Sequence, residues 1–293
     1  MASGIKAHKP KLHKKGKKDS FYMGGDVIEV RSREKRVKIP KLGFVKLTEE
    51  LRTEGRILSS TISREADNWF ISFTIEPVIC FDLCENQTYL KVGVDLGIKT
   101  LAVLSNGETF ELPKKIKQSR KKLSRESRRL SRKQHSRSKN DKTPKSKNYE
   151  KQQIKVAKVH ARIANIRKDA LHKLTTYLTI NFKNISIEDL NIKGMLANRK
   201  LSRAISELGL YEFRRQLEYK SVKRGNNLII VDRWFPSSKT CSCCGNVKET
   251  LLLSERIYKC TECEFEIDRD LNAAINLENK IPLAQREFTT AEI

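Results

Sequence analysis

The stretches "SSKTCSCCG" at residues 237–245 and "YKCTECEFEIDRDLNAAINL" at 258–277 decide most about the fold of this chain. They hold two C-x2-C pairs, Cys241 with Cys244 and Cys260 with Cys263. Each two-residue knuckle turns two thiolates toward one ion, so the pairs predict a tetrahedral Zn site of the zinc-ribbon type. A closed set of four thiolates leaves no open coordination position, and we therefore expect the zinc to be structural.

Three further cysteines lie outside these pairs. Cys243 stands inside the first pair, and we interpret it as a spectator because Cys241 with Cys244 preserves the two-residue knuckle. Cys80 and Cys84 have no second pair nearby and are interpreted as ordinary thiols. Disulfides are the alternative, but no apolar signal segment opens the chain, and free thiols beside a metal motif are typical of a reducing compartment. We expect a cytoplasmic protein.

The composition points to a polyanionic partner. The 293 residues carry 60 Lys and Arg against 35 Asp and Glu, a formal charge of +25. Such an excess usually marks nucleic acid binding. No segment reaches the roughly 18 consecutive apolar residues of a membrane span, so a membrane partner is not expected. The length suggests about two domains.

The basic charge is concentrated in two segments. Residues 1–18 hold seven lysines and no acid, which predicts a basic arm, and residues 114–158 hold 19 Lys and Arg against three acids. Apolar residues recur with helical spacing on both sides of the polar stretch 134–150, so we predict a basic helical hairpin over 114–178. Its outer surface should bind phosphates without reading sequence. The candidate contacts are Arg125, Arg128, Arg129 and Arg132.

The region before the hairpin has a β pattern. Short apolar runs at 27–30, 37–39, 44–47 and 58–62, followed by period-two alternation from Trp69 to Ile75, predict a small antiparallel domain. We expect a partial β-barrel with its connector over residues 19–90. A new unit then begins with "YLKVGVDLGIKTLAVLSNGETFEL" at 89–112, which predicts strands and a turn at Asn106-Gly107.

Acidic residues follow apolar segments at three separate places. Asp95 ends the run in "VGVDLG", Glu188 ends the run in "NISIEDL", and Asp268 and Asp270 open the helix of "DRDLNAAINL". Each alone is ordinarily a turn residue or a helix cap. Together they fit hydrolysis of a phosphodiester by two metal ions, which requires carboxylates that converge from several elements. The expected order β-β-β-helix-β-helix-β-helix is that of an α/β RNase H-like domain.

Five segments together resemble the TnpB family, RNA-guided nucleases encoded by insertion sequences and related to type V CRISPR effectors. They are "VGVDLGIKTLAVLS", "ISIEDLNIKGM", "YEFRRQLEYKS", "VDRWFPSSKTCSCCG" and "DRDLNAAINL". The resemblance covers roughly residues 10–280 and implies a RuvC-type nuclease domain (91–232), a zinc ribbon (233–267), a last RuvC helix (268–282) and a tail (283–293). A wedge-like barrel would precede them.

The resemblance also implies residue roles. Asp95 and Glu188 match the first two catalytic acids, with Mg²⁺ as the catalytic ion. The third acid matches Asp270, two residues before Asn272, and Asp268 remains the alternative. The implied activity is an RNA-guided DNA endonuclease associated with transposition, with guide RNA and DNA as partners.

The N-terminus departs from the family pattern. Family members usually carry a longer N-terminal part, so we expect this chain to begin inside the barrel, with truncated target recognition and activity that could be impaired. The alternative is a nucleic-acid-binding remnant without productive cleavage. A zinc-ribbon transcription factor ranks third, because it explains the ribbon and not the three acids.

Overall fold

The computed structural model describes residues 19–77, 89–133, 145–252 and 254–282. The predicted basic arm, the thiols Cys80 and Cys84, and the tail lie outside these ranges. Contacts divide the chain into two units, one of residues 1–80 with 126–161 and one of residues 81–125 with 162–293. The division runs through both helices of the hairpin, which the sequence had assigned whole to the nuclease domain.

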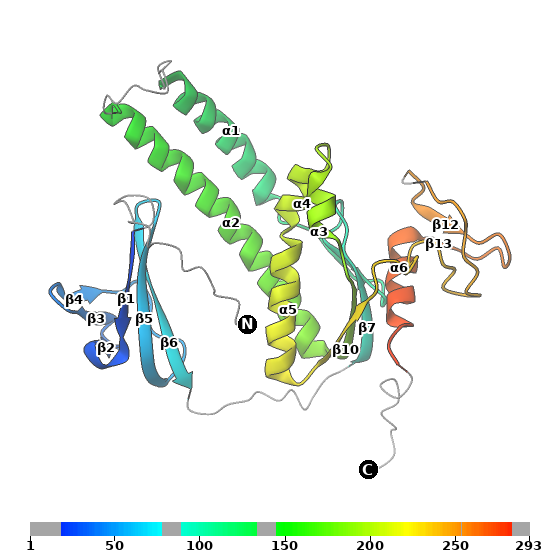
Figure 1. Ribbon diagram of the computed structural model, residues 1–293, viewed down its shortest axis with the longest axis horizontal. Coiled ribbons are helices and arrows are strands. Elements are labelled where there is room, and N and C mark those ends of the chain that lie inside the picture. The colour runs from blue at the N-terminus through cyan, green and yellow to red at the C-terminus, as the bar shows by residue number, and fades with distance from the viewer. Residues whose placement is uncertain (1–18, 78–88, 134–144, 253, 283–293) are drawn as a thin grey trace, which may run out of the picture. The chain divides into compact units, whose positions relative to one another are not determined.

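The β part of the first unit consists of two small antiparallel sheets (Figure 1). The first has the order β1-β5-β6 and consists of β1 (Ser20–Gly24), β5 (Gly55–Glu65) and β6 (Asn68–Pro77). The second has the order β2-β3-β4 and consists of β2 (Glu29–Arg31), β3 (Arg36–Ile39) and β4 (Gly43–Lys46). The strands enclose a small apolar cluster made by Met23, Val37, Ile39 and Ile62.

The strand predictions hold in this unit with one shift. The strand expected from Val27 begins only at Glu29, because Gly25–Val27 form a 3-10 turn (η1) closed by a bond from Ile28 N to Gly25 O of 3.1 Å. The alternation in β6 is confirmed from Ile71 onward, since Ile71, Phe73 and Ile75 are half-buried while the residues between them are exposed. Trp69, where the predicted alternation began, is exposed.

The helical hairpin is confirmed as α1 (Lys115–Lys133) and α2 (Lys147–Asn181). The two helices are joined by a buried polar contact that periodicity did not predict. The side chain of Glu126 is buried, and Gln152 Nε2 donates to its Oε2 at 2.8 Å and to its main-chain oxygen at 3.1 Å. Lys158 on α2 pairs with Asp67 in the β5–β6 turn at 2.6 Å. These bonds link the parts of α1 and α2 that belong to the first unit to each other and to the β5–β6 turn.

A five-stranded sheet organises the second unit, in the order β11-β10-β7-β8-β9. Its strands are β7 (Tyr89–Asp95), β8 (Ala102–Leu104), β9 (Thr109–Phe110), β10 (Phe182–Glu188) and β11 (Asn227–Val231). Strands β7, β8 and β9 are antiparallel, whereas β10 is parallel to both β7 and β11. The turn expected at Asn106-Gly107 joins β8 to β9, with Gly107 at φ +87°.

Helices cover both faces of this sheet. Val92 and Val94 join the main apolar core together with α2, α4 (Ser202–Leu208) and α5 (Leu210–Arg224). Because side chains alternate along a strand, Gly93 between them faces the other way. There it meets α6 (Arg269–Glu278), and Figure 1 shows the sheet between α5 and α6. A short helix, α3 (Ile192–Ala197), follows β10.

Helix α6 lies directly on β7 because Gly93 has no side chain. A Cβ at this position would stand 1.9 Å from Ala274 O and 2.5 Å from Glu278 N, both main-chain atoms of α6. Lys91 on β7 also pairs with Glu278 at 2.9 Å. Gly93 thus leaves room beside β7 for the main chain of α6.

A small two-stranded sheet, β12 (Ile257–Lys259) and β13 (Glu266–Asp268), leads into α6. Tyr258 is fully buried there against Cys241 and Cys260. Among the described residues, no helix is long and apolar enough to cross a membrane.

Candidate functional site

Two of the predicted acids end adjacent parallel strands. Asp95 is the last residue of β7 and Glu188 the last of β10, and Val94 pairs with Ile187 one position earlier. Parallel strands end at the same edge of a sheet, so both carboxylates lie there. Asp95 is two residues beyond Gly93 and therefore shares the face that α6 covers.

Asp268 and Asp270, the two candidates for the third acid, have different environments at the start of α6. Asp268 is the N-cap: its Oδ1 accepts from the main-chain N of Asp270 at 2.9 Å and of Leu271 at 3.1 Å. This is the usual role of an aspartate in this position. Asp270, in the first turn, lines one cleft together with Asp95 and Glu188.

Burial and neighbouring carboxylate charges favour the protonated form of two of these acids, Asp95 and Glu188. Burial, followed by the charges of Asp270 and Glu188, raises the pKa of Asp95 to about 7, although Arg269 acts in the opposite direction. Burial and the charge of Asp189 also raise the pKa of Glu188. The cleft therefore resists ionisation of Asp95 and Glu188, as expected at a site where carboxylates bind a positive partner.

Asp189, the neighbour of Glu188, has a different environment. It accepts from Arg214 at 2.7 Å and also pairs with Arg233. These two arginines lower its pKa, with the hydrogen bond from Arg233 as the largest cause. Asp189 thus anchors α5 and the segment after β11, whereas Glu188 faces the cleft.

The cleft has a volume of about 830 Å³ and a basic lining. Arg256 Nη1 lies 4.0 Å from Asp270 Oδ2. The other basic residues that line it are Lys99, Arg233, Lys239 and Arg269. Acids surrounded by basic side chains can hold cations while attracting a phosphate backbone.

The four paired cysteines form a compact cluster. The Sγ atoms of Cys241 and Cys263 are 3.7 Å apart and those of Cys244 and Cys260 are 3.5 Å apart. All four Sγ atoms lie within 4.8 Å of one another, and in the described part of the chain no other set of three or more possible ligands is so close. The cluster could hold a metal ion. Cys243 is exposed and outside it, as the spacing predicted.

Two equivalent knuckles build the cluster. Cys241 N donates to Asn246 O at 2.8 Å, and Cys260 N donates to Phe265 O at 2.9 Å in the same relative position. Each knuckle turns through a left-handed residue, Gly245 and Glu264. The main-chain N–H groups of Cys263 and Glu262 lower the pKa of Cys260 to about 6, which favours the thiolate that a metal requires.

Sequence reasoning assigned no role to two asparagines of α6 that tie this cluster to the acids. Asn272 Nδ2 donates to Thr240 O at 2.7 Å, and its Oδ1 accepts from Ser242 N at 3.0 Å. Asn276 Nδ2 donates to Ser237 O at 2.8 Å and Thr240 O at 2.6 Å. Both are buried. The sequence did contain a signal for them: two asparagines spaced i, i+4 among apolar residues lie on the buried face of a helix, and buried amides require hydrogen-bond partners.

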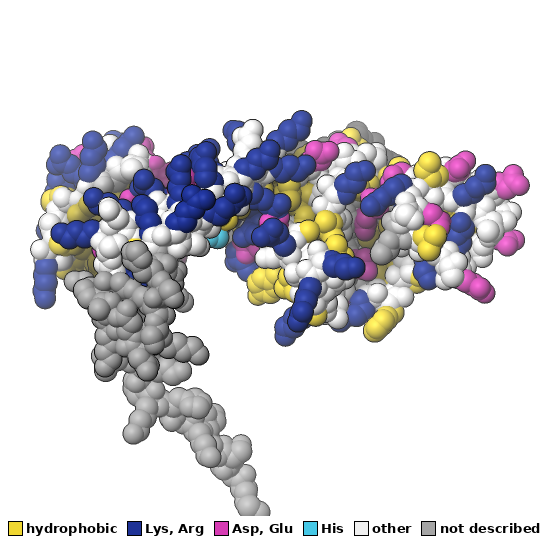
Figure 2. Space-filling view, turned by 90° about the horizontal axis from the view of Figure 1, so that it is seen from above, with side chains coloured by type: hydrophobic (Ala, Val, Ile, Leu, Met, Phe, Trp, Pro, Cys, Tyr) yellow, Lys and Arg dark blue, Asp and Glu magenta, His cyan; other side chains and the backbone are white. Residues whose placement is uncertain are grey.

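The four candidate arginines lie exposed on α1. Arg129 Nη1 pairs with Glu126 Oε1 at 3.1 Å, so part of the charge of Arg129 is already compensated. Figure 2 shows Lys and Arg side chains crowded over a wide area of one face of the molecule. The basic surface expected from composition is therefore present, and its contact with nucleic acid remains a prediction.

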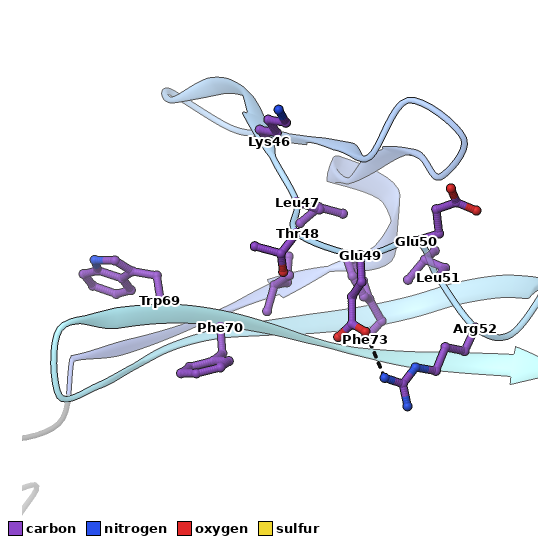
Figure 3. A pocket seen from close by; sticks show the side chains of 11 residues that line it. Lys46, Leu47, Thr48, Glu49, Glu50, Leu51, Arg52, Trp69, Phe70 and Phe73 are labelled. Carbon is purple, nitrogen blue, oxygen red and sulfur yellow. Dashed lines mark hydrogen bonds and ion pairs between the residues drawn. The ribbon is translucent and has the colours of Figure 1, made fainter. Parts of the chain in front are cut away.

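A second cavity, of about 300 Å³, lies within the first unit (Figure 3). The segment from Lys46 to Arg52 and the strand β6 line it, and the aromatic residues among the lining are Trp69, Phe70 and Phe73. Glu49 and Arg52 form an ion pair of 2.8 Å beside it. This cavity is separate from the acids and combines ring surface with charged groups.

Two family models match the chain. One, described as "Probable transposase" (OrfB_IS605), covers residues 81–199, and the other, described as "Cas12f1-like, TNB domain", covers residues 211–277. A solved structure, that of a Cas12f1-sgRNA-target DNA complex, is similar with a TM-score of 0.52 at 19% identity, over 77% of this chain and 46% of that one. This similarity concerns the fold alone.

Curated relatives extend the match. A Streptomyces pristinaespiralis protein named "Putative RNA-guided DNA endonuclease" is 42% identical over 74% of this chain and 51% of its own length. InsQ of Escherichia coli K12, with the same description, is 32% identical over 92% of this chain and 67% of its own length. The chain thus spans about half to two thirds of these relatives. The motifs, the arrangement of acids and cysteines, and these similarities place the chain in the TnpB family of insertion-sequence OrfB proteins.

Proposed function

We propose that this chain is an RNA-guided DNA endonuclease of the TnpB type, associated with transposition. The observation that carries the proposal is the cleft in which Asp95, Glu188 and Asp270 meet although they come from three separate elements. The names of the curated relatives support the activity. Because the chain spans only part of their length, its activity, its guide RNA and its DNA target are inferred.

The second unit would be an RNase H-like nuclease domain of the RuvC type. Its three antiparallel strands followed by two parallel ones support this, together with the acids at the ends of β7 and β10. The first unit would be a partial wedge-like barrel that binds guide RNA. Arg31 over Phe44, at 4.4 Å from the ring centroid, is one of its paired cationic and aromatic groups.

The donor sets fit two different metals. Carboxylate oxygens suit Mg²⁺, and four cysteine thiolates suit a structural Zn²⁺. When bound by the acids, Mg²⁺ would supply Lewis acidity at the scissile phosphodiester. The raised pKa of Asp95 supports a cation here, because a positive ion would offset the burial and the neighbouring negative charges that now favour protonation of that carboxyl.

The protein's own residues would position the substrate. Lys99, Arg256 and Arg269 line the cleft and would hold the phosphates of a DNA strand near the acids. Asp268 would keep the first turn of α6 in place through its cap bonds, so that Asp270 remains directed at the cleft. The asparagines of α6 would hold the cysteine-bearing segment against the same helix.

The proposal is tested by DNA cleavage with the full chain, the RNA that copurifies with it, and Mg²⁺. Asp95→Asn, Glu188→Gln and Asp270→Asn should each abolish cleavage while nearly preserving nucleic-acid affinity, since affinity rests on the basic surface. Asp268→Asn is the matched control, because asparagine caps helices about as well as aspartate.

Two results would count against these assignments. Loss of cutting in Asp268→Asn with retention in Asp270→Asn would reverse the choice of the third acid. Tight binding of RNA and DNA without any Mg²⁺-dependent cleavage would favour the alternative, a nucleic-acid-binding remnant.

A further inference from the structure

Trp234 is an exposed aromatic residue on the wall of the cleft that contains Asp95, Glu188 and Asp270. Its side chain is 84% exposed, yet it lines the same cleft as Asp95, Glu188 and Asp270. Single exposed hydrophobic residues are common and need no explanation by themselves. The position of this one, beside carboxylates and basic side chains, calls for an account of what covers it.

The backbone that carries Trp234 is held in place. Trp234 N donates to Asp232 Oδ1 at 2.7 Å, and Phe235 N donates to Asp232 O at 3.0 Å. Lys280 lies 4.2 Å from the centroid of the Phe235 ring. Asn276 of α6 binds Ser237 O. The main chain that carries the indole is therefore already ordered, so little conformational freedom of the backbone would be lost when a flat ligand covers the ring.

Other apolar side chains line the same cleft. Ile98 and Leu201 are 42% and 40% exposed and come from the β7–β8 loop and the start of α4, with Met195 of α3 near them. Basic residues line the cleft as well, including Arg256 and Arg269. The cleft thus offers an apolar wall and cationic groups together, which matches a ligand with flat rings on an anionic backbone.

We propose that Trp234 stacks on a base of single-stranded DNA and so positions the strand whose backbone reaches the three acids. The inference rests on the proposed function, because it assumes that the cleft accepts DNA. A paired duplex keeps its base faces covered, whereas a single strand exposes them to aromatic side chains. Trp234 would therefore select for unpaired DNA without reading its sequence.

The chain contains two tryptophans, which allows a direct optical test. In the full chain with Trp69→Phe, Trp234 is the sole tryptophan, and Asp95→Asn in the same chain prevents cutting. Its fluorescence is titrated with a single-stranded oligonucleotide, with an abasic strand of the same length, and with duplex. We expect quenching by the base-containing strand and little by the other two.

Affinity supplies a second measurement. Trp234→Ala should weaken single-stranded DNA binding by roughly 5- to 150-fold, the range for loss of one stacked base, and should leave duplex binding within about 2-fold. Trp234→Phe should retain most of the affinity because it keeps a ring. Val222→Ala is the control, since Val222 is equally exposed and does not line the cleft.

Equal quenching by the abasic strand, or unchanged affinity in Trp234→Ala, would overturn the inference. Neither measurement requires cleavage. Stacking without Mg²⁺-dependent cutting would support Trp234 and refute the endonuclease, whereas normal cutting without stacking would refute only the role of Trp234.

Discussion

Gly93→Ala should both destabilise the protein and disable the cleft, because this glycine lets α6 rest on β7. The added Cβ would stand 1.9 Å from Ala274 O, whereas ordinary contact begins at 3.4 Å. The clash is with main chain, so no rotamer change relieves it. Helix α6 would have to retreat by about 1.5 Å, an overpacking that costs on the order of 1–3 kcal/mol.

The same retreat would move Asp270 away from Asp95. A misplacement of about 1 Å at a reacting centre can cost on the order of 100-fold in rate. We therefore expect Gly93→Ala to lower the free energy of unfolding by about 2 kcal/mol in urea titrations, and to reduce the rate of Mg²⁺-dependent cleavage about 100-fold.

Two matched variants make the test specific. Gly24→Ala is the control, since no atom lies within 4 Å of a Cβ there and its φ of −67° suits alanine. Adding Ala274→Gly to Gly93→Ala should not rescue the protein, because it removes no atom of the clashing carbonyl. If Gly93→Ala proved as stable and active as Gly24→Ala, the close packing of α6 on β7 would be refuted.

Three further predictions follow from the cysteines, the acids and the hairpin. Cys244→Ser should lose the single Zn²⁺ that metal analysis should find in the intact chain, and Cys243→Ser should retain it; the opposite pattern would overturn the ligand assignment. The ordinary pKa of Asp95, 3.8, rises to about 7 in the folded chain, so metal-free protein should lose stability as pH rises between these values and no further above them. In urea titrations with chelator at pH 8, Asp95→Asn should therefore be more stable than the parent by up to about 4 kcal/mol, and equal stability would contradict the shift. Neutralising the four arginines of α1 should lower the magnitude of the salt slope of nucleic-acid binding by roughly 3, because each lost phosphate contact lowers it by roughly 0.7–0.9; an unchanged slope would place the hairpin away from the nucleic acid.

Sequence alone was sufficient for features that arise over short stretches of chain. The C-x2-C spacing predicted the four-cysteine cluster, because a two-residue knuckle is a local geometry that brings two thiols together wherever it occurs. Periods of 3.6 and 2 predicted the long helices and the alternation in β6, since each reflects the backbone geometry of one element. The same local pattern placed Asp95 and Glu188 at the ends of strands, because an apolar run followed by an acid marks where a buried strand stops.

Only the tertiary structure decided how distant segments meet. The sequence preferred Asp270 to Asp268 through the resemblance alone, and the cap bonds together with the cleft show that the two acids have different environments. Periodicity predicted an apolar seam in the hairpin, whereas Glu126 and Gln152 form a buried polar pair across it. The need for Gly93, the asparagines that hold the cysteine segment and the position of Trp234 all depend on contacts between residues far apart along the chain. No local pattern encodes such contacts, because they exist only once the separate elements have packed.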